Sequence, residues 1–403
     1  MTTSRRFRLS LFGLLYFVQG AALAYFRNFQ KPYLNSLNVD LDTIGLLTSI
    51  LLLPFILKIF IGMLSDRVNL VGLGHRKPYI ILGLLLAAAA FGAAGFVLPD
   101  TNLTLFAILI VTGSFSVALF DSTTDGLAID ITPQSEQGLV QGTMVSGRAI
   151  GFIILSLVFG LMAQSQGYRV VFLIIAAGML LPLWWVLRVR EPRERDITQQ
   201  FQWSAFKLMV QPAFLLFGAY AIVYSIASFG IDGLVTLFMS EQFGASETVI
   251  GQYGAWRGVG AVAGAVAGGV LIGRLGRKRS AIVAAIVICV AAILLGMAPG
   301  VNFLLMMGLI WGIAWGFQET VFVALAMNLA DLRIAASMFA IMMAISNLGT
   351  AIGEGAATAL VDDLGFTIVL WLLGGVSLLT LPILGGLFKK SAETGRKSVI
   401  SEQ

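Results

Sequence analysis

The most regular feature of the sequence is a series of uninterrupted apolar runs, each about as long as a membrane is thick. Residues 80–98, 281–297 and 369–388 are examples. About 20 apolar residues cross the ~30 Å hydrocarbon core as a helix, and lipid forces each backbone polar group to find a partner within the protein. A barrel strand would instead alternate apolar and polar residues. We therefore predict twelve spanning α-helices, near residues 9–34, 43–64, 78–98, 103–129, 138–163, 168–188, 212–238, 246–272, 280–298, 302–328, 335–359 and 366–388.

The composition agrees with this all-α, polytopic membrane class. Hydrophobic residues make up 58% of the chain and charged residues 12%, which is too little charge to cover the surface of a soluble protein of this length. Cys289 and His75 are the only residues of their types, so the sequence holds no cysteine framework or metal cluster. It also lacks a phosphate-binding Gly-x-x-x-x-Gly-Lys-Ser/Thr motif. We expect no cofactor, no metal and no enzymatic activity.

The most polar stretch lies between the sixth and seventh predicted spans and divides the chain in half. It runs from Arg188 to Lys207 and is rich in arginine and glutamate. We therefore predict an N-terminal six-helix bundle, a linker, a C-terminal six-helix bundle and a tail, at residues 1–190, 191–207, 208–390 and 391–403.

Basic residues are concentrated on one side of the predicted membrane. They gather in the N-terminal tail, the linker and the loops on the same side, whereas the opposite loops carry acids such as Asp40 and Asp100. Lysine and arginine mark cytoplasmic segments, so both termini are predicted to be cytoplasmic, in a bacterial-type inner membrane. The sequence pI of about 9.4 is then explained by basic loops that face anionic lipid headgroups, and it does not indicate nucleic-acid binding.

A short pattern recurs in the second half. Gly62-Met-Leu-Ser-Asp66-Arg67 closes the second predicted span, and a related Gly269-Val-Leu-Ile-Gly273-Arg274 closes the eighth, about half the chain later. A repeat at half-length with the same topology implies two bundles related by an axis along the membrane normal, with a binding site between them.

The first of these loops resembles the signature of the major facilitator superfamily, Gly-x-Leu-x-Asp-Arg followed by Gly-Arg-Lys. The second copy departs from it, because Gly273 stands where the aspartate would be. The resemblance implies twelve helices in two pseudo-symmetric bundles, alternating access and a cytoplasmic gate. Residues that match the signature, or lie in its second copy, are Gly62, Leu64, Asp66, Arg67, Gly74, Arg76, Lys77, Arg274 and Arg277.

Further motifs resemble particular branches of that superfamily. The order Pro54, Lys58, Asp66, together with the pair Asp121 and Asp125, is similar to the muropeptide permease and acetyl-CoA transporter branch. The loop 73–80 also resembles that of sugar–cation symporters and bacteriochlorophyll-delivery proteins. These motifs indicate a neighbourhood of subfamilies and leave the substrate open.

Nine ionisable residues fall inside the predicted spans. Each costs roughly 2.5–3.5 kcal/mol on insertion scales, so each is expected to have a partner or to line a pathway. Permanent ion pairs that hold helices together are the competing interpretation. The nine are Arg27, Lys58, Asp121, Asp125, Arg148, Asp232, Arg257, Glu319 and Glu354.

Asp121 and Asp125 are the most informative of the nine. Four residues apart, they project from the same helix face about one turn from each other. Two carboxylates this close in a low dielectric disfavour a double negative charge. They are therefore candidates for carrying a coupling proton, with Lys58 and Arg148 as candidate cations. Alternatively, the carboxylates and the hydroxyls of residues 122–124 could bind sodium.

These features together favour a secondary transporter. We expect a monomer that moves a small anionic or zwitterionic organic solute, amphiphilic ones included, by proton-coupled symport. Two alternatives stay open at this point: a sodium-coupled sugar symporter, and a non-transporting pigment-delivery or assembly factor on the same fold.

Overall fold

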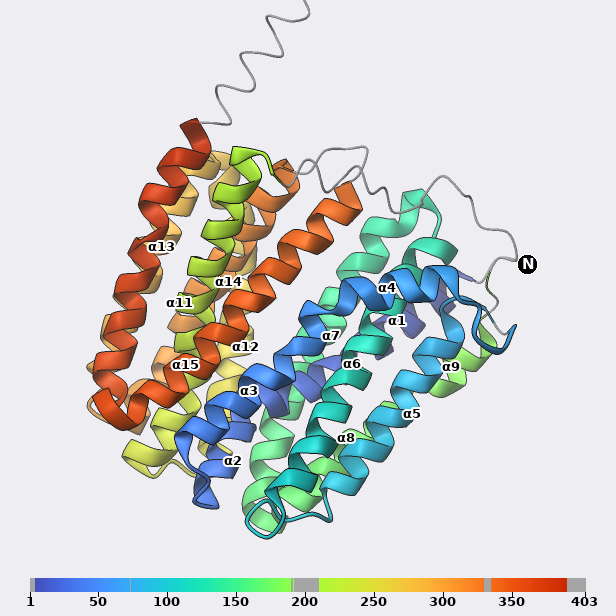
Figure 1. The fold of residues 1–403 in the computed structure, drawn as a ribbon, viewed down its shortest axis with the longest axis horizontal. Helices are drawn as coiled ribbons and strands as arrows, with labels where there is room; N and C mark the ends of the chain where they lie inside the picture. Colours follow the sequence, from blue (N-terminus) through green and yellow to red (C-terminus); the bar gives the residue numbers. More distant parts are fainter. Residues whose placement is uncertain (1–3, 73, 190, 192–209, 330–334, 390–403) are drawn as a thin grey trace, which may run out of the picture. The chain divides into compact units, whose positions relative to one another are not determined.

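The computed structural model describes residues 4–72, 74–189, 191, 210–329 and 335–389, and every regular element among them is helical (Figure 1). The predicted tail 391–403 and, apart from Glu191, the predicted linker 191–207 lie outside the described residues. The elements are α1 (Arg5–Ala24), η1 (Tyr25–Phe29), α2 (Gln30–Ser36), α3 (Leu41–Ile56), α4 (Lys58–Arg67), η2 (Leu70–Gly72), α5 (Lys77–Ala94), α6 (Leu103–Ile131), η3 (Gln134–Glu136), α7 (Gln137–Gln166), α8 (Tyr168–Leu180), α9 (Leu183–Arg188), α11 (Pro212–Phe243), α12 (Glu247–Leu275), α13 (Arg277–Gly296), α14 (Val301–Leu329) and α15 (Ala335–Leu378).

Within the described part of the chain, eleven helical segments are long and apolar enough to cross a membrane. The last segment, Met338–Lys389, is 52 residues long. It contains Gly365, whose φ of 75° interrupts the helical backbone, and this glycine lies between the predicted eleventh and twelfth spans. The predicted all-α polytopic class is confirmed.

Polar side chains fix where several helices begin. Ser4 accepts a hydrogen bond from the Phe7 N–H at the start of α1, and Asn102 accepts one from Leu105 at the start of α6. Asp40 does the same for the Thr43 N–H, 2.8 Å away, at the start of α3. This hydrogen bonding lowers the pKa of the exposed Asp40 carboxyl, because an anion is favoured at a helix N-terminus.

Two interruptions occur beside charged residues. The predicted second span is two helices: Pro54 lies inside α3, and the chain leaves regular helix three residues later, at Leu57. Lys58 is the first residue of the next helix. The predicted first span contains a π-helix, η1, which includes Arg27; short π segments often mark functional positions.

The chain divides into two compact units, residues 1–199 with 236–258, and residues 200–235 with 259–403. In the first unit α1 packs along α7, and α5 contacts both α6 and α8; in the second, α13 contacts α14 and α15. The predicted bundle boundaries stay a prediction.

Glycines bring α1 and α7 into backbone contact. A Cβ atom added to Gly20 would lie 2.2 Å from the Arg148 carbonyl oxygen, and one added to Gly151 would lie 2.2 Å from the Phe17 carbonyl oxygen. Small residues at a helix interface permit such an approach. The register between α1 and α7 is therefore fixed.

This packing predicts a difference between two glycines of the same helix. Gly151→Ala places a methyl group against the α1 backbone and should cost about 1–3 kcal/mol, which lowers the unfolding midpoint in detergent. Gly142→Ala is the control, because its new methyl group would meet nothing within 4 Å. Equal midpoints for the two variants would contradict the close packing.

Candidate functional site

Three charged side chains meet between α4 and α6 in the first unit. Lys58 Nζ lies 3.1 Å from Asp121 Oδ2 and 3.7 Å from Asp125 Oδ2. The Asp121 side chain is 5% exposed, whereas those of Asp125 and Lys58 are 40% and 29% exposed. One ammonium is therefore shared by two carboxylates, and only one of these carboxylates is well exposed.

Helix α1 supplies an uncharged donor to each carboxylate. Gln19 Nε2 donates to Asp121 Oδ1 over 2.7 Å, and the Tyr16 hydroxyl donates to Asp125 Oδ1. The sequence alone gave no reason to select Tyr16. The three-residue spacing that places both side chains on one helix face was the available signal.

Arg148, the other predicted cation, contacts the ring of Tyr16. Its side chain is on α7 and exposed, and its Cζ lies 5.8 Å from the centre of the Tyr16 ring. This distance is within the range of a cation–π contact. Tyr16 thus lies between Arg148 and Asp125.

Two of the hydroxyls considered for sodium binding are already engaged. Ser122 Oγ donates to the Lys58 carbonyl oxygen over 3.1 Å, and Thr123 Oγ1 donates to the Leu119 carbonyl oxygen over 2.7 Å. The Ser122 contact fastens α6 to the first turn of α4. It therefore helps to place the Lys58 ammonium beside the two carboxylates.

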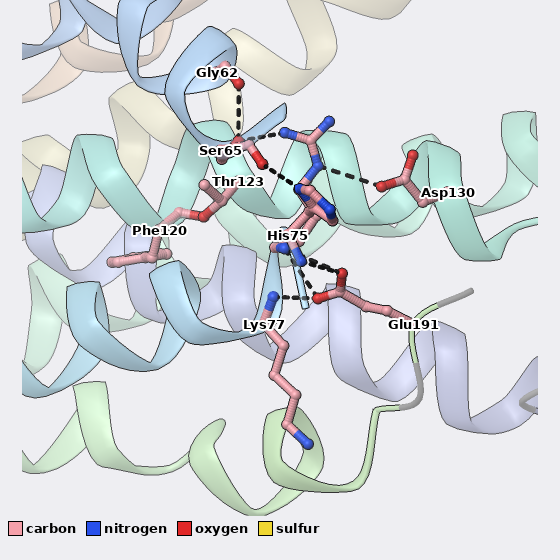
Figure 2. Close-up of polar contacts among 9 residues, drawn as sticks. Gly62, Ser65, His75, Lys77, Phe120, Thr123, Asp130 and Glu191 are labelled. Carbon is pink, nitrogen blue, oxygen red and sulfur yellow. Dashed lines mark hydrogen bonds and ion pairs between the residues drawn. The ribbon is translucent and has the colours of Figure 1, made fainter. Parts of the chain in front are cut away.

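A second polar network joins the loop before α5 to α4 and α6 (Figure 2). The Arg76 side chain donates to Ser65 Oγ and, from Nε over 3.3 Å, to Asp130 Oδ2. Its guanidinium group packs on Gly126, where an added Cβ would lie 2.4 Å from Arg76 Cζ. Asp130 is therefore paired and half-buried, not simply solvated.

Glu191 completes this network from the polypeptide that follows α9. Its carboxylate accepts hydrogen bonds from three consecutive backbone N–H groups, those of His75, Arg76 and Lys77, as Figure 2 shows. Backbone N–H groups at a helix start form a favourable anion site. The sequence analysis missed Glu191, because a charged linker is typically solvated; the adjacent helix start was the only signal.

Of the other residues of the predicted cytoplasmic gate, Lys77 belongs to this network through its backbone N–H. Lys77 Nζ donates to the Leu187 carbonyl oxygen over 2.6 Å, while Arg67, Arg274 and Arg277 are exposed near the ends of their helices. The Asp66 side chain lies outside the described part of the structure. The gating role of these residues stays a prediction.

In the second unit, acids of α11 and α14 bond to aromatic side chains. Trp311 Nε1 donates to Asp232 Oδ1 over 2.8 Å, and the Tyr224 hydroxyl donates to Glu319 Oε1. The Tyr224 ring stacks on Phe322 with centroids 4.8 Å apart. These acids are held by neutral donors within their own unit.

Three further predicted residues occupy separate places. Arg257 is buried, with its Cζ 5.2 Å from the centre of the Phe152 ring. Arg27 is half-buried in η1, and Glu354 is buried on α15. The structure thus joins Lys58, Asp121 and Asp125 directly, and it brings Arg148 to the ring of Tyr16, whose hydroxyl bonds to Asp125.

The sequence profile of the Major Facilitator Superfamily matches residues 12–238 and 220–402. The anhydromuropeptide permease of Escherichia coli strain K12 is 27% identical over 176 residues, which cover 43% of this chain and 35% of the permease. The probable folate-biopterin transporter 7 of Arabidopsis thaliana is 27% identical over 194 residues, or 45% of this chain and 42% of that protein. The matches thus span less than half the length of either relative.

Solved structures share the fold over nearly the whole chain. A variant of the nucleoside transporter NupG gives a TM-score of 0.79 at 15% identity, with 94% of this chain and 100% of that chain covered. An inward-facing, unoccupied bacterial homologue of the human lysosomal transporter Spinster gives 0.71 at 18% identity, with 96% of both chains covered. All of these proteins are named as permeases or transporters, in agreement with the non-enzymatic class predicted from the sequence.

The Glu191 contacts predict a local change in backbone protection. Glu191→Ala removes the acceptor of three amides, so hydrogen exchange at His75, Arg76 and Lys77 should become about ten times faster. Asp100→Ala, at an exposed acid beyond the far end of α5, is the matched control. Unchanged protection of the three amides in Glu191→Ala would refute the role of this carboxylate.

Proposed function

The chain belongs to the Major Facilitator Superfamily, and on this premise we propose that it carries a small organic solute across the membrane by alternating access. Similarity to proteins named as permeases and transporters supports this proposal. Residues 1–190 and 208–390 would move against one another, with the Arg76 network on the cytoplasmic side. Two halves of similar topology are the usual basis of such movement. We propose a bacterial-type inner membrane, cytoplasmic termini and a monomer.

The observation that carries the coupling proposal is the sharing of Lys58 by Asp121 and Asp125. Two carboxylates share one ammonium among spanning helices, where charge is costly, and the second base nearby, Arg148, contacts the Tyr16 ring. A proton on one carboxylate removes the repulsion between the two acids. Asp125 is the better candidate for taking up this proton, because its side chain is 40% exposed and that of Asp121 is only 5% exposed. A different affinity for this proton in the two access states would drive transport.

Sodium coupling has less support from the same geometry. A sodium ion needs several oxygen ligands, of which the two carboxylates would be the charged ones. The Lys58 ammonium already lies against both carboxylates. An added cation would have to displace or oppose it.

The solute is proposed to be anionic or zwitterionic and larger than a simple ion. Exposed Arg148 provides a planar donor group that suits a carboxylate or phosphate, and the acids of the second unit suit an ammonium group. Anhydromuropeptide, named for one relative, is the first solute to test. Nucleosides and folates form the rest of the panel.

Replacement of Asp125 should separate coupling from solute exchange. In proteoliposomes with an imposed pH gradient, Asp125→Asn should abolish concentrative uptake, because the amide cannot take up the proton. Counterflow exchange should persist, and Asp363→Asn, at an exposed acid, should behave like the original protein. Equal loss of uptake and exchange would assign Asp125 to the solute site. Uptake driven by a sodium gradient alone would contradict proton coupling.

Arg148 and Arg257 are the arginines that we propose to bind the anionic group of the solute, so loss of either should weaken binding. Arg148→Ala and Arg257→Ala should each lower the affinity for the transported solute about tenfold or more, as expected when a charged hydrogen bond is lost. Arg169→Ala provides the control, because this exposed arginine of α8 lies over Phe96. If both variants bind the solute with unaltered affinity, the result would favour the other interpretation, in which these arginines form permanent ion pairs that hold helices together.

A further inference from the structure

Tyr16 touches two functional groups with different parts of its side chain. Its hydroxyl donates to Asp125 Oδ1, while its ring lies beneath the Arg148 guanidinium, 5.8 Å from Cζ to the ring centre. The tyrosine is buried at 8% exposure, although both of its partners are more open. It therefore bridges the proposed proton site and the proposed solute site.

The helices around Tyr16 leave little freedom for the backbone. Gly13 and Gly20 lie on either side of it along α1, and a Cβ atom added to Gly147 of α7 would lie 2.4 Å from the Gly13 carbonyl oxygen. Because α1 and α7 are in backbone contact at both points, Tyr16 and Arg148 cannot separate by a shift of these helices. Any change in their contact must come from their side chains.

The hydrogen bond from Tyr16 depends on the charge of Asp125. The charged and titratable groups that face Asp125 are Asp121 on the same helix, Lys58 on α4, Tyr16 on α1 and Arg148 on α7. A hydrogen bond to a carboxylate is about twice as strong as one between neutral groups. When Asp125 gains a proton, its contact with the Tyr16 hydroxyl weakens and the ring is free to change rotamer.

We propose that Tyr16 is a positioning residue that couples the protonation of Asp125 to the availability of Arg148. With Asp125 charged, the hydroxyl is held and the ring stays against the guanidinium. With Asp125 neutral, the ring is released and Arg148 is free to bind an anionic group of the solute. This inference rests on the proposed function and assigns an order to it: the proton binds first and prepares the arginine.

A substitution that keeps the ring and removes the hydroxyl tests this link without any solute. In purified protein in detergent, the infrared carbonyl band of protonated Asp125 is identified as the band that Asp125→Asn removes. Tyr16→Phe should move the midpoint of its titration about one to two pH units higher, because the carboxylate loses a donor. Tyr25→Phe is the matched control, since the buried Tyr25 hydroxyl has no hydrogen-bond partner among the described residues.

The second readout is chemical modification of Arg148 by phenylglyoxal, measured by mass spectrometry relative to exposed Arg169. The ratio of the two rates should rise as Asp125 becomes protonated in the original protein and in Tyr25→Phe. It should be independent of pH in Tyr16→Phe and Asp125→Asn.

Tyr16→Phe could leave both the titration midpoint of Asp125 and the pH dependence of the Arg148 to Arg169 modification ratio as they are in the original protein. That result would overturn the role of Tyr16 and leave proton coupling intact. If no carbonyl band titrates in the original protein, proton coupling through Asp125 falls as well. The two failures are therefore distinguishable.

Discussion

The shared ammonium of Lys58 is the interaction on which the rest of the first unit depends. Two carboxylates one turn apart on α6 repel each other, and the ammonium lies 3.1 and 3.7 Å from them. The break at Leu57 places Lys58 at the start of a helix, and Ser122 fastens that start to α6. Neutral donors from α1 complete the carboxylate contacts. The two acids share one ammonium and still repel each other, which is a reason for one of them to bind a proton.

Helix α6 also connects this cluster to the Arg76 loop network. Gly126, which follows Asp125, accommodates the Arg76 guanidinium group, and Asp130 binds it at the next turn. Arg76 in turn contacts Ser65 of α4, and its loop is held by Glu191. A rotation of α6 about its axis would therefore disturb both networks. This shared helix is a physical route by which the charge on Asp125 can influence the Arg76 loop network.

The sequence allowed the elements and part of this site to be predicted. Span length identified the helices, and helical periodicity placed Asp121 and Asp125 on one face, because both depend on local spacing alone. The partner of the two acids could be identified only from the tertiary structure, because Lys58 and Arg148 were equally good candidates by charge. Only the packing of α1 against α7 placed Arg148 over Tyr16.

Two important residues gave almost no signal in the sequence. Tyr16 lies in an apolar helix where a tyrosine is usually a packing residue, and its hydroxyl matters only because α6 presents Asp125 to it. Glu191 lies among arginines in a stretch that composition marks as solvated. Its role depends on three backbone N–H groups that are more than a hundred residues away, and backbone donors leave no mark in a sequence.

The central claim is that the Lys58, Asp121 and Asp125 cluster carries a proton together with the solute. The most direct test records the internal pH of proteoliposomes while anhydromuropeptide, or another solute of the panel that is transported, flows inward down its own gradient with no pH gradient imposed. The account predicts acidification of the lumen in step with solute entry, and none with Asp125→Asn. Solute entry without acidification, or undiminished acidification in Asp125→Asn, would contradict it.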